Sequence, residues 1–251
     1  MSDQKYRLVT RADFDGVVSG GLLVEKGLIG DIMFADPGDV QAGRVAIGEN
    51  DITTSLPYVE AAHLCFNRHV SEQERVGDKD NLIIDPTAPS VARVVFSYYG
   101  EKEGFPEISE ELLDVVDHAQ SAQYSIEDIL APEKWTLLYF LLDPRTGMSR
   151  FEDEFAIPHD QLMKDMMTYV RHHPIEEILQ LPDVEERLLF YQFRSEKAEH
   201  QINRCTTQDG TVAVCDFRGE DILEVGNRFM IYGLFPECSV SVQVSRSSTP
   251  G

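Results

Sequence analysis

The sequence predicts an α/β protein, and three patterns along the chain lead to this class. The first ~120 residues alternate short apolar runs, typical of strands, with helix-like segments, as in a parallel sheet flanked by helices. Residues 126–203 carry apolar side chains at helical spacing, and the last ~47 residues contain short β-like runs separated by Gly and Pro. We therefore expect a parallel-sheet domain (1–125), a helical connector (126–203) and a partial, β-containing C-terminal domain (204–251).

The expected elements follow from the apolar runs and the residues that flank them. Strands are predicted at 6–10, 32–35, 61–66, 81–85 and 112–116 in the first domain, and at 211–216, 228–234 and 239–244 in the last. Helices are predicted at 17–26, 90–99, 109–113, 161–172 and 182–202. The helix at 109–113 and the strand at 112–116 overlap, so they are alternatives for one segment.

The composition is ordinary for a globular protein. Hydrophobic residues make up 42% of the 251 residues and charged residues 26%. No apolar stretch approaches the ~20 residues of a membrane span, and the N-terminal segment lacks the features of a signal peptide. Four cysteines without Cys-x-x-Cys spacing indicate reduced, mostly buried thiols. These features predict a cytoplasmic protein that does not enter a membrane.

The net charge of −22 bears on the ligand. An acidic surface repels nucleic acid, and no basic stripe with interleaved aromatics is present, so we expect no broad nucleic-acid-binding surface. An anionic substrate would need bound cations or a few arginines at the site. The acidity is equally consistent with a role in solubility alone.

Two aspartates, Asp13 and Asp15, lie between the predicted strand 6–10 and the predicted helix 17–26. Ligands of open α/β sheets bind at the carboxyl ends of strands, and two carboxylates there can reach one divalent cation or a pair of them. Gly16 allows a tight turn after them. The alternative is a polar loop in which Asp15 or a neighbour caps the helix.

Further polar groups follow apolar runs at comparable spacing. They are Asp51, the segment Asn67-Arg68-His69, and Asp117. We expect these groups to converge with Asp13 and Asp15 on one edge of the sheet. Arg145, in the loop Asp-Pro-Arg-Thr-Gly, is a candidate to bind a phosphate of the substrate.

The order of these motifs resembles the DHH phosphoesterase superfamily, and most closely its exopolyphosphatase-related members. The resemblance runs from residue 6 to about residue 244. It is carried by six blocks in the same order, residues 9–16 (VTRADFDG), 56–59 (LPYV), 66–72 (FNRHVSE), 85–90 (DPTAPS), 143–147 (DPRTG) and 227–232 (NRFMIY). The resemblance implies a parallel-sheet DHH domain joined to a smaller substrate-binding domain.

The resemblance also implies roles for individual residues. Asp13, Asp15, Asp51 and Asp117 match metal ligands, and His69 matches a histidine that faces the substrate. The implied reaction is hydrolysis of a phosphoester or phosphoanhydride, in polyphosphate, a short oligonucleotide or a nucleotide. Two Mn²⁺ or Mg²⁺ ions would generate the attacking hydroxide and neutralise charge in the transition state.

The sequence departs from the family where Asp-His-His is expected, because it has Asn67-Arg68-His69. Arg68 cannot ligate a metal at neutral pH, since its guanidinium stays protonated. The chain also ends before the Gly-Gly-Gly-His block of the family, so we expect only part of the substrate-binding domain. An alternative is therefore a catalytically silent relative, a binding or assembly module in which Arg68 and Arg11 replace metal charge. Across these alternatives the protein would bind zero to two ions, and a degenerate site would bind zero or one. A homodimer or a paralogue would be a natural partner.

Overall fold

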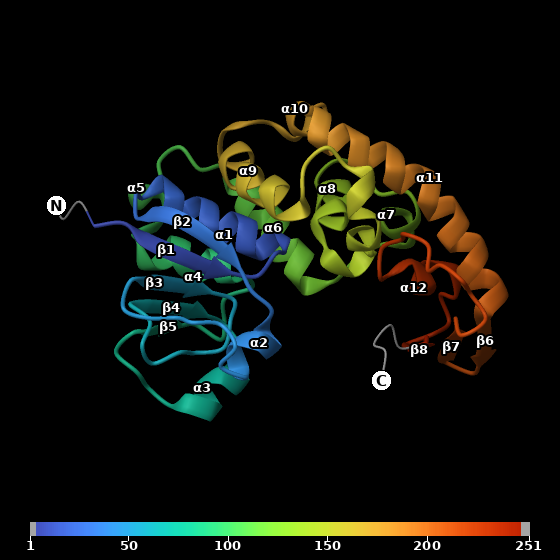
Figure 1. The fold of residues 1–251 in the computed structure, drawn as a ribbon, viewed down its shortest axis with the longest axis horizontal. Coiled ribbons are helices and arrows are strands. Elements are labelled where there is room, and N and C mark those ends of the chain that lie inside the picture. Colours follow the sequence, from blue (N-terminus) through green and yellow to red (C-terminus); the bar gives the residue numbers. More distant parts are fainter. Residues whose placement is uncertain (1–3, 247–251) are drawn as a thin grey trace. The chain divides into compact units, whose positions relative to one another are not determined.

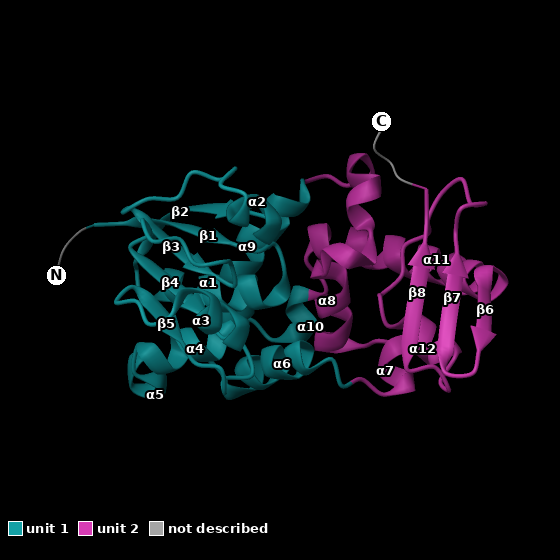
Figure 2. Cartoon of the chain, turned by 90° about the horizontal axis from the view of Figure 1, so that it is seen from below, with its two compact units in different colours: residues 1–123, 158–178 teal, residues 124–157, 179–251 magenta. Residues whose placement is uncertain are grey.

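The computed structural model describes residues 4–246, and the chain divides into two compact units (Figures 1 and 2). Within the described range, unit 1 contains the residues up to 123 and residues 158–178. Unit 2 contains residues 124–157 and the residues from 179 onward. The predicted α/β class is confirmed, with a five-stranded parallel sheet in unit 1 and a small mixed sheet in unit 2.

Unit 1 is built on the parallel sheet, whose strand order is β2-β1-β3-β4-β5. Its strands are β1 (Tyr6–Thr10), β2 (Ile29–Phe34), β3 (Asp51–Thr54), β4 (Leu64–Asn67) and β5 (Leu82–Ile84). Its helices are α1 (Phe14–Glu25), α2 (Pro37–Gln41), α3 (Val70–Val76), α4 (Val91–Tyr98), α5 (Glu101–Gly104), α6 (Glu110–Ser121), α9 (His159–His172) and α10 (Ile175–Ile178). The carboxyl ends of β1, β3 and β4 therefore lie next to one another along one edge.

Helices α1 and α4 pack on one face of this sheet, and α9 packs against α1 (Figure 1). Gly20 and Gly21 of α1 allow this helix to lie close to strand β1 and to helix α9. A Cβ atom at Gly20 would lie 2.8 Å from both Leu8 Cδ2 and Met167 Cε, and one at Gly21 would lie 2.9 Å from the Met167 carbonyl oxygen. This contact joins α9, far along the chain, to the first domain.

The opposite face of the sheet is covered by α2 and by the loops around β3 and β4. Val9, on β1, packs there with Val40 and Leu56, while Leu8 faces α1. A second cluster of Ala62, Cys65 and Leu82 continues this layer toward β5. The alternation of Leu8 and Val9 between the two faces is the two-residue period of a strand buried on both sides.

The predicted strand at 112–116 is wrong, because this segment lies within helix α6. Ser109 caps the helix by accepting a hydrogen bond from the Leu112 backbone N–H. Its buried residues, Leu112, Leu113, Val116 and Ala119, follow the three-and-four spacing of one helical face. The alternative helix at 109–113 is the correct one.

Unit 2 combines helices with a three-stranded sheet of order β6-β7-β8 (Figure 2). The strands are β6 (Thr206–Asp209), β7 (Val212–Asp216) and β8 (Val240–Val244). The helices are α7 (Ile126–Leu130), α8 (Lys134–Leu142), the 3-10 segments η1 (Pro144–Thr146) and η2 (Met148–Glu154), α11 (Pro182–Cys205) and α12 (Met230–Leu234). The core between the sheet and the helices contains Ala213, Cys215, Phe217, Ile231 and Cys238.

Two predictions for unit 2 differ from the structure. Residues 230–234 of the predicted strand 228–234 form helix α12, because Asn227 starts a turn with its side chain accepting from the Phe229 N–H. The residues 126–203 do not form one connector. They are divided between the units, because α9 packs on α1 whereas α11 belongs to unit 2.

No helix among residues 4–246 combines the length and apolar character needed to cross a membrane. The four cysteines are free thiols, as predicted, and three of them are buried.

Candidate active site

Asp13 and Asp15 lie at the carboxyl end of β1, where the sequence places them. Asp13 caps α1, because its Oδ1 accepts a hydrogen bond of 2.9 Å from the Gly16 N–H. Its Oδ2 lies 3.1 Å from Arg11 Nε. A Cβ atom at residue 16 would lie 2.1 Å from the Arg11 carbonyl oxygen, so only glycine fits this turn. The turn therefore holds Asp13 in one orientation.

Asp15 is almost fully buried in the first turn of α1. Its two carboxylate oxygens accept hydrogen bonds from the backbone N–H groups of Val91 and Ala92, at 3.0 and 2.8 Å. These N–H groups open helix α4, where a negative charge is favoured. Burial first, and then the negative charge of Asp13, nevertheless raise the pKa of Asp15, whereas the two N–H groups and Arg68 oppose the shift. The net result is a pKa of about 6, against 3.8 as the ordinary value.

The segment Asn67-Arg68-His69 follows β4 at the same edge, as predicted. Asn67 is buried, and its side-chain oxygen accepts from the backbone N–H groups of Arg68 and His69, at 2.7 and 3.0 Å. Its amide nitrogen donates to the Leu56 carbonyl oxygen. Asn67 therefore holds the turn that presents the next two residues.

His69 begins helix α3 and carries no side-chain cap hydrogen bond there. Its pKa is lowered, first by partial burial and then by the positive charges of Arg68 and Arg11. The same Arg68 charge acts on buried Asp15. The structure therefore brings two arginines, a neutral histidine and two aspartates together at the ends of β1 and β4.

Ser55 lies between these groups, directly after β3, and the sequence did not single it out. Its φ angle of 58° is strained for a residue with a side chain, and its buried hydroxyl has no hydrogen-bond partner. Beside it, the hydroxyls of Thr10 and Thr54 lie 2.6 Å apart. The signal that could have found Ser55 is its place after the run Ile52-Thr53-Thr54.

Asp51 is not brought to this edge, so the expectation that it follows a strand is wrong. It is the first residue of β3 and pairs in register with Arg7, while Thr54 pairs with Thr10 at the other end. Three residues of a strand span about 10 Å, so Asp51 lies at the opposite edge from Asp13. Its oxygens each bind the Arg7 guanidinium at 2.8 Å. The pair is a structural ion pair within the sheet.

Asp117 lies on α6 and not after a strand, but it approaches the start of α4. Its Oδ1 accepts a hydrogen bond of 2.6 Å from Ser90, the residue that caps α4. Its Oδ2 binds Arg93 at 2.7 Å. Asp117 and Asp15 therefore contact neighbouring residues of α4, and Arg93 balances the charge of Asp117.

The residues present do not fit the two-metal centre that the sequence predicts. Among residues 4–246, no three His, Cys, Asp or Glu side chains are grouped so that they could hold a metal ion. The oxygens of Asp13 and Asp15 are engaged by backbone N–H groups and by Arg11. Arg68 adds a permanent positive charge where a third ligand would be needed.

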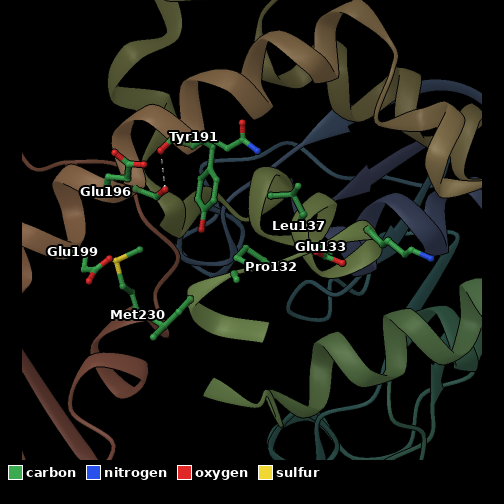
Figure 3. Close-up of a pocket in the computed structure, with 12 residues that line it drawn as sticks. Pro132, Glu133, Leu137, Tyr191, Glu196, Glu199 and Met230 are labelled. Carbon is green, nitrogen blue, oxygen red and sulfur yellow. Dashed lines mark hydrogen bonds between the residues drawn. The ribbon is translucent and has the colours of Figure 1, made fainter. Parts of the chain in front are cut away.

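Arg145 lies in unit 2, in segment η1, where its Nε and Nη2 each bind buried Asp143 at 2.8 Å. The same unit contains a cavity of about 700 Å³ between α11 and the start of α8 (Figure 3). Glu133, Glu196 and Glu199 line it together with the single cation Lys134. This acidic lining disfavours a phosphate ligand, so cavity size alone does not identify the site.

The fold and the charged edge define a DHH-like phosphoesterase domain. A solved structure, described as a pGpG-specific phosphodiesterase, PggH from Vibrio cholerae, matches with a TM-score of 0.85 and 42% sequence identity. The match covers 96% of this chain and 78% of that chain. The chain therefore belongs to the DHH-type phosphoesterases. The match does not support the narrower assignment to the exopolyphosphatase-related members.

A second solved chain, an uncharacterized protein from Helicobacter pylori G27, is 10% identical with a TM-score of 0.34, over 96% of this chain and 82% of that chain. This likeness is too weak to carry an argument. No protein-family model matches the chain, and no curated protein does.

Proposed function

We propose that this protein binds a short, nucleotide-like phosphate ester at the carboxyl edge of β1, β3 and β4. The observation that carries the proposal is the 42% identity, over 96% of the chain, to a phosphodiesterase specific for pGpG. A linear dinucleotide of this kind is therefore the first ligand to test. The dinucleotide is an anion, and the two arginines provide local positive charge for it in a chain of net charge −22.

In the proposed site, Arg11 and Arg68 attract the phosphate, and Arg68 binds it through its guanidinium. His69 is neutral at pH 7 because its pKa is lowered, so one ring nitrogen donates a hydrogen bond and the other accepts one. The unpaired Ser55 hydroxyl supplies a further donor. Asp13 and Asp15 hold the turn and helix α4 in place.

We further propose that metal-dependent hydrolysis is slow compared with a two-metal enzyme, because the arginines replace cation charge without generating a hydroxide. This corresponds to the predicted binding module with zero or one ion. The second candidate is efficient hydrolysis with Mn²⁺ or Mg²⁺. It is favoured by the identity to a protein described as a pGpG-specific phosphodiesterase and by the presence of Asp13 and Asp15 at the edge.

Calorimetric titration with linear pGpG, in EDTA and then in Mn²⁺, tests the proposal. We expect binding in EDTA, and a loss of about tenfold in Arg68→Gln. Arg44→Gln is the matched control, because Arg44 forms an exposed ion pair with Asp39. The absence of binding in both conditions would refute the proposal.

Product formation by chromatography separates the two candidates. We expect slow turnover of the wild type in Mn²⁺ and a gain in the double variant Asn67→Asp/Arg68→His. Fast wild-type turnover that EDTA abolishes would favour the second candidate. A cytoplasmic location and a homodimer or paralogue partner remain parts of the proposal, and sedimentation of the purified protein tests self-association.

A further inference from the structure

Two large apolar side chains of helix α11, in unit 2, are exposed to solvent. Phe193 is 61% exposed and Leu189 is 59% exposed, although polar residues usually occupy the solvent face of a helix. Because they lie four residues apart, these side chains are neighbours and form one ridge along α11. The Lys197 ammonium lies 4.1 Å from the centre of the Phe193 ring and leaves most of the ring uncovered. Adjacent exposed apolar side chains of this kind mark a contact site for another protein.

The ridge adjoins the cavity of about 700 Å³ between α11 and the start of α8 (Figure 3). Phe193 is followed three residues later by Glu196, and Leu189 by Gln192, so each lies beside a residue that lines the cavity. The apolar lining includes Leu130, Leu137, Tyr191 and Met230. We call the cavity and the ridge of Leu189 and Phe193 together the α11 groove. Its apolar surface is therefore larger than the cavity alone.

The α11 groove is acidic, and its carboxylates are not neutralised. Glu196 and Glu199 belong to α11, whereas Glu133 is the residue before α8. Within the described range 4–246, none of these three carboxylates forms an ion pair. Lys134 is the single cation among the residues that line the cavity. The groove therefore combines apolar surface with excess negative charge.

We propose that the α11 groove binds a basic amphipathic helix of a partner protein. Apolar side chains at three-and-four spacing on such a helix cover the ridge and enter the cavity, while its Lys or Arg side chains face the carboxylates. A second copy of this chain is a poorer partner, because its net charge of −22 is repelled by the same carboxylates. A small polyamine neutralises the carboxylates but has no side chains to cover Phe193. The inference goes beyond the proposed function and does not depend on it.

Fluorescence anisotropy of a labelled synthetic peptide, titrated with the full chain, tests the inference. The peptide has about 18 residues, enough to form a helix, with Leu at three-and-four spacing and Lys elsewhere. We expect it to bind one chain, and to bind Phe193→Ala about tenfold more weakly because an aromatic anchor is lost. Glu196→Gln should weaken binding about threefold and reduce its dependence on salt.

Two matched variants remove similar groups outside the α11 groove. Ile222→Ala truncates another exposed apolar residue of unit 2, which is 54% exposed. Glu185→Gln removes a carboxylate from the same helix, at a position that is not among the described residues lining the cavity. We expect neither variant to change the affinity by more than about twofold. Circular dichroism checks that all four variants are folded.

Comparison ligands decide between the possible occupants. A peptide of the same composition, reordered so that Leu is spread around the helix, should bind at least about tenfold more weakly. Equal binding of the reordered peptide, or equal effects of Phe193→Ala and Ile222→Ala, would overturn the inference, because charge alone would then explain binding. Spermidine binding that Glu196→Gln weakens, with peptide binding unchanged in Phe193→Ala, would identify a small polycation as the ligand instead. A dimer that Phe193→Ala disperses in sedimentation would identify a second copy of the chain instead.

Discussion

The buried carboxylate of Asp15 makes the stability of the protein depend on pH in a predictable direction. Its pKa is about 6 in the folded protein, against 3.8 as the ordinary value. Between these values the folded state binds a proton that the unfolded state has released. The contribution of Asp15 to stability is therefore fully present below about pH 4 and is lost as the pH rises to about 6. The two-unit shift corresponds to about 3 kcal/mol.

Asp15→Asn isolates this contribution. The variant cannot ionise at residue 15, so its free energy of unfolding, minus that of the wild type, should increase by about 3 kcal/mol between pH 4 and 7. The variant also loses one of two backbone hydrogen bonds, because its amide has a single oxygen for Val91 and Ala92. At pH 4 the wild-type carboxyl is protonated and also offers a single carbonyl oxygen, so the change of hydrogen bonding with pH is already contained in the pKa of Asp15. Urea unfolding followed by circular dichroism gives both free energies.

Asp13→Asn serves as the matched control. Asparagine caps a helix about as well as aspartate, but the variant removes the negative charge that raises the pKa of Asp15. We expect the window of pH dependence to move to lower pH. The prediction is wrong if the free energies of unfolding of Asp15→Asn and the wild type differ by the same amount, within about 1 kcal/mol, from pH 4 to 7.

Two further predictions concern the same edge of the sheet. Arg68→Gln should raise the pKa of His69, because it removes a positive charge that disfavours the imidazolium, whereas Arg44→Gln should leave it unchanged; NMR titration of the His69 ring measures both. Gly16→Ala should lower the free energy of unfolding by about 3 kcal/mol in urea, because its Cβ overlaps a backbone oxygen. Gly48→Ala is the comparison, since a Cβ there meets no atom within 4 Å. Equal effects of the two alanines would show that crowding at residue 16 is not the cause.

The sequence predicted the residues of the charged edge that directly follow a strand. The turn from β1 into α1 holds Asp13 and Asp15 within a few residues of a strand end, and the segment after β4 does the same for Arg68. The long helices α9 and α11 were predictable for the same reason, because their apolar residues repeat at helical spacing.

The edge to which a polar residue belongs was not predictable for β3. In the short segment from Asp51 to Ser55, the exact bounds of the strand determine which of these two polar residues lies at its carboxyl end. A shift of three or four residues exchanges Asp51 for Ser55 at the site and converts a predicted metal ligand into half of an ion pair with Arg7. The apolar run in α6 was ambiguous as well, because such a short run fits both the helical period of 3.6 residues and the strand period of two.

The sequence by itself determined the fold class, the turn after β1 and the substitution of Arg68 where a metal ligand was expected. The tertiary structure decided what these groups do. The pKa of Asp15 depends on N–H groups 76 and 77 residues away, and the place of α9 depends on glycines in α1. Such contacts join distant segments, and they form only when the sheet and its helices pack, so no local pattern in the sequence encodes them.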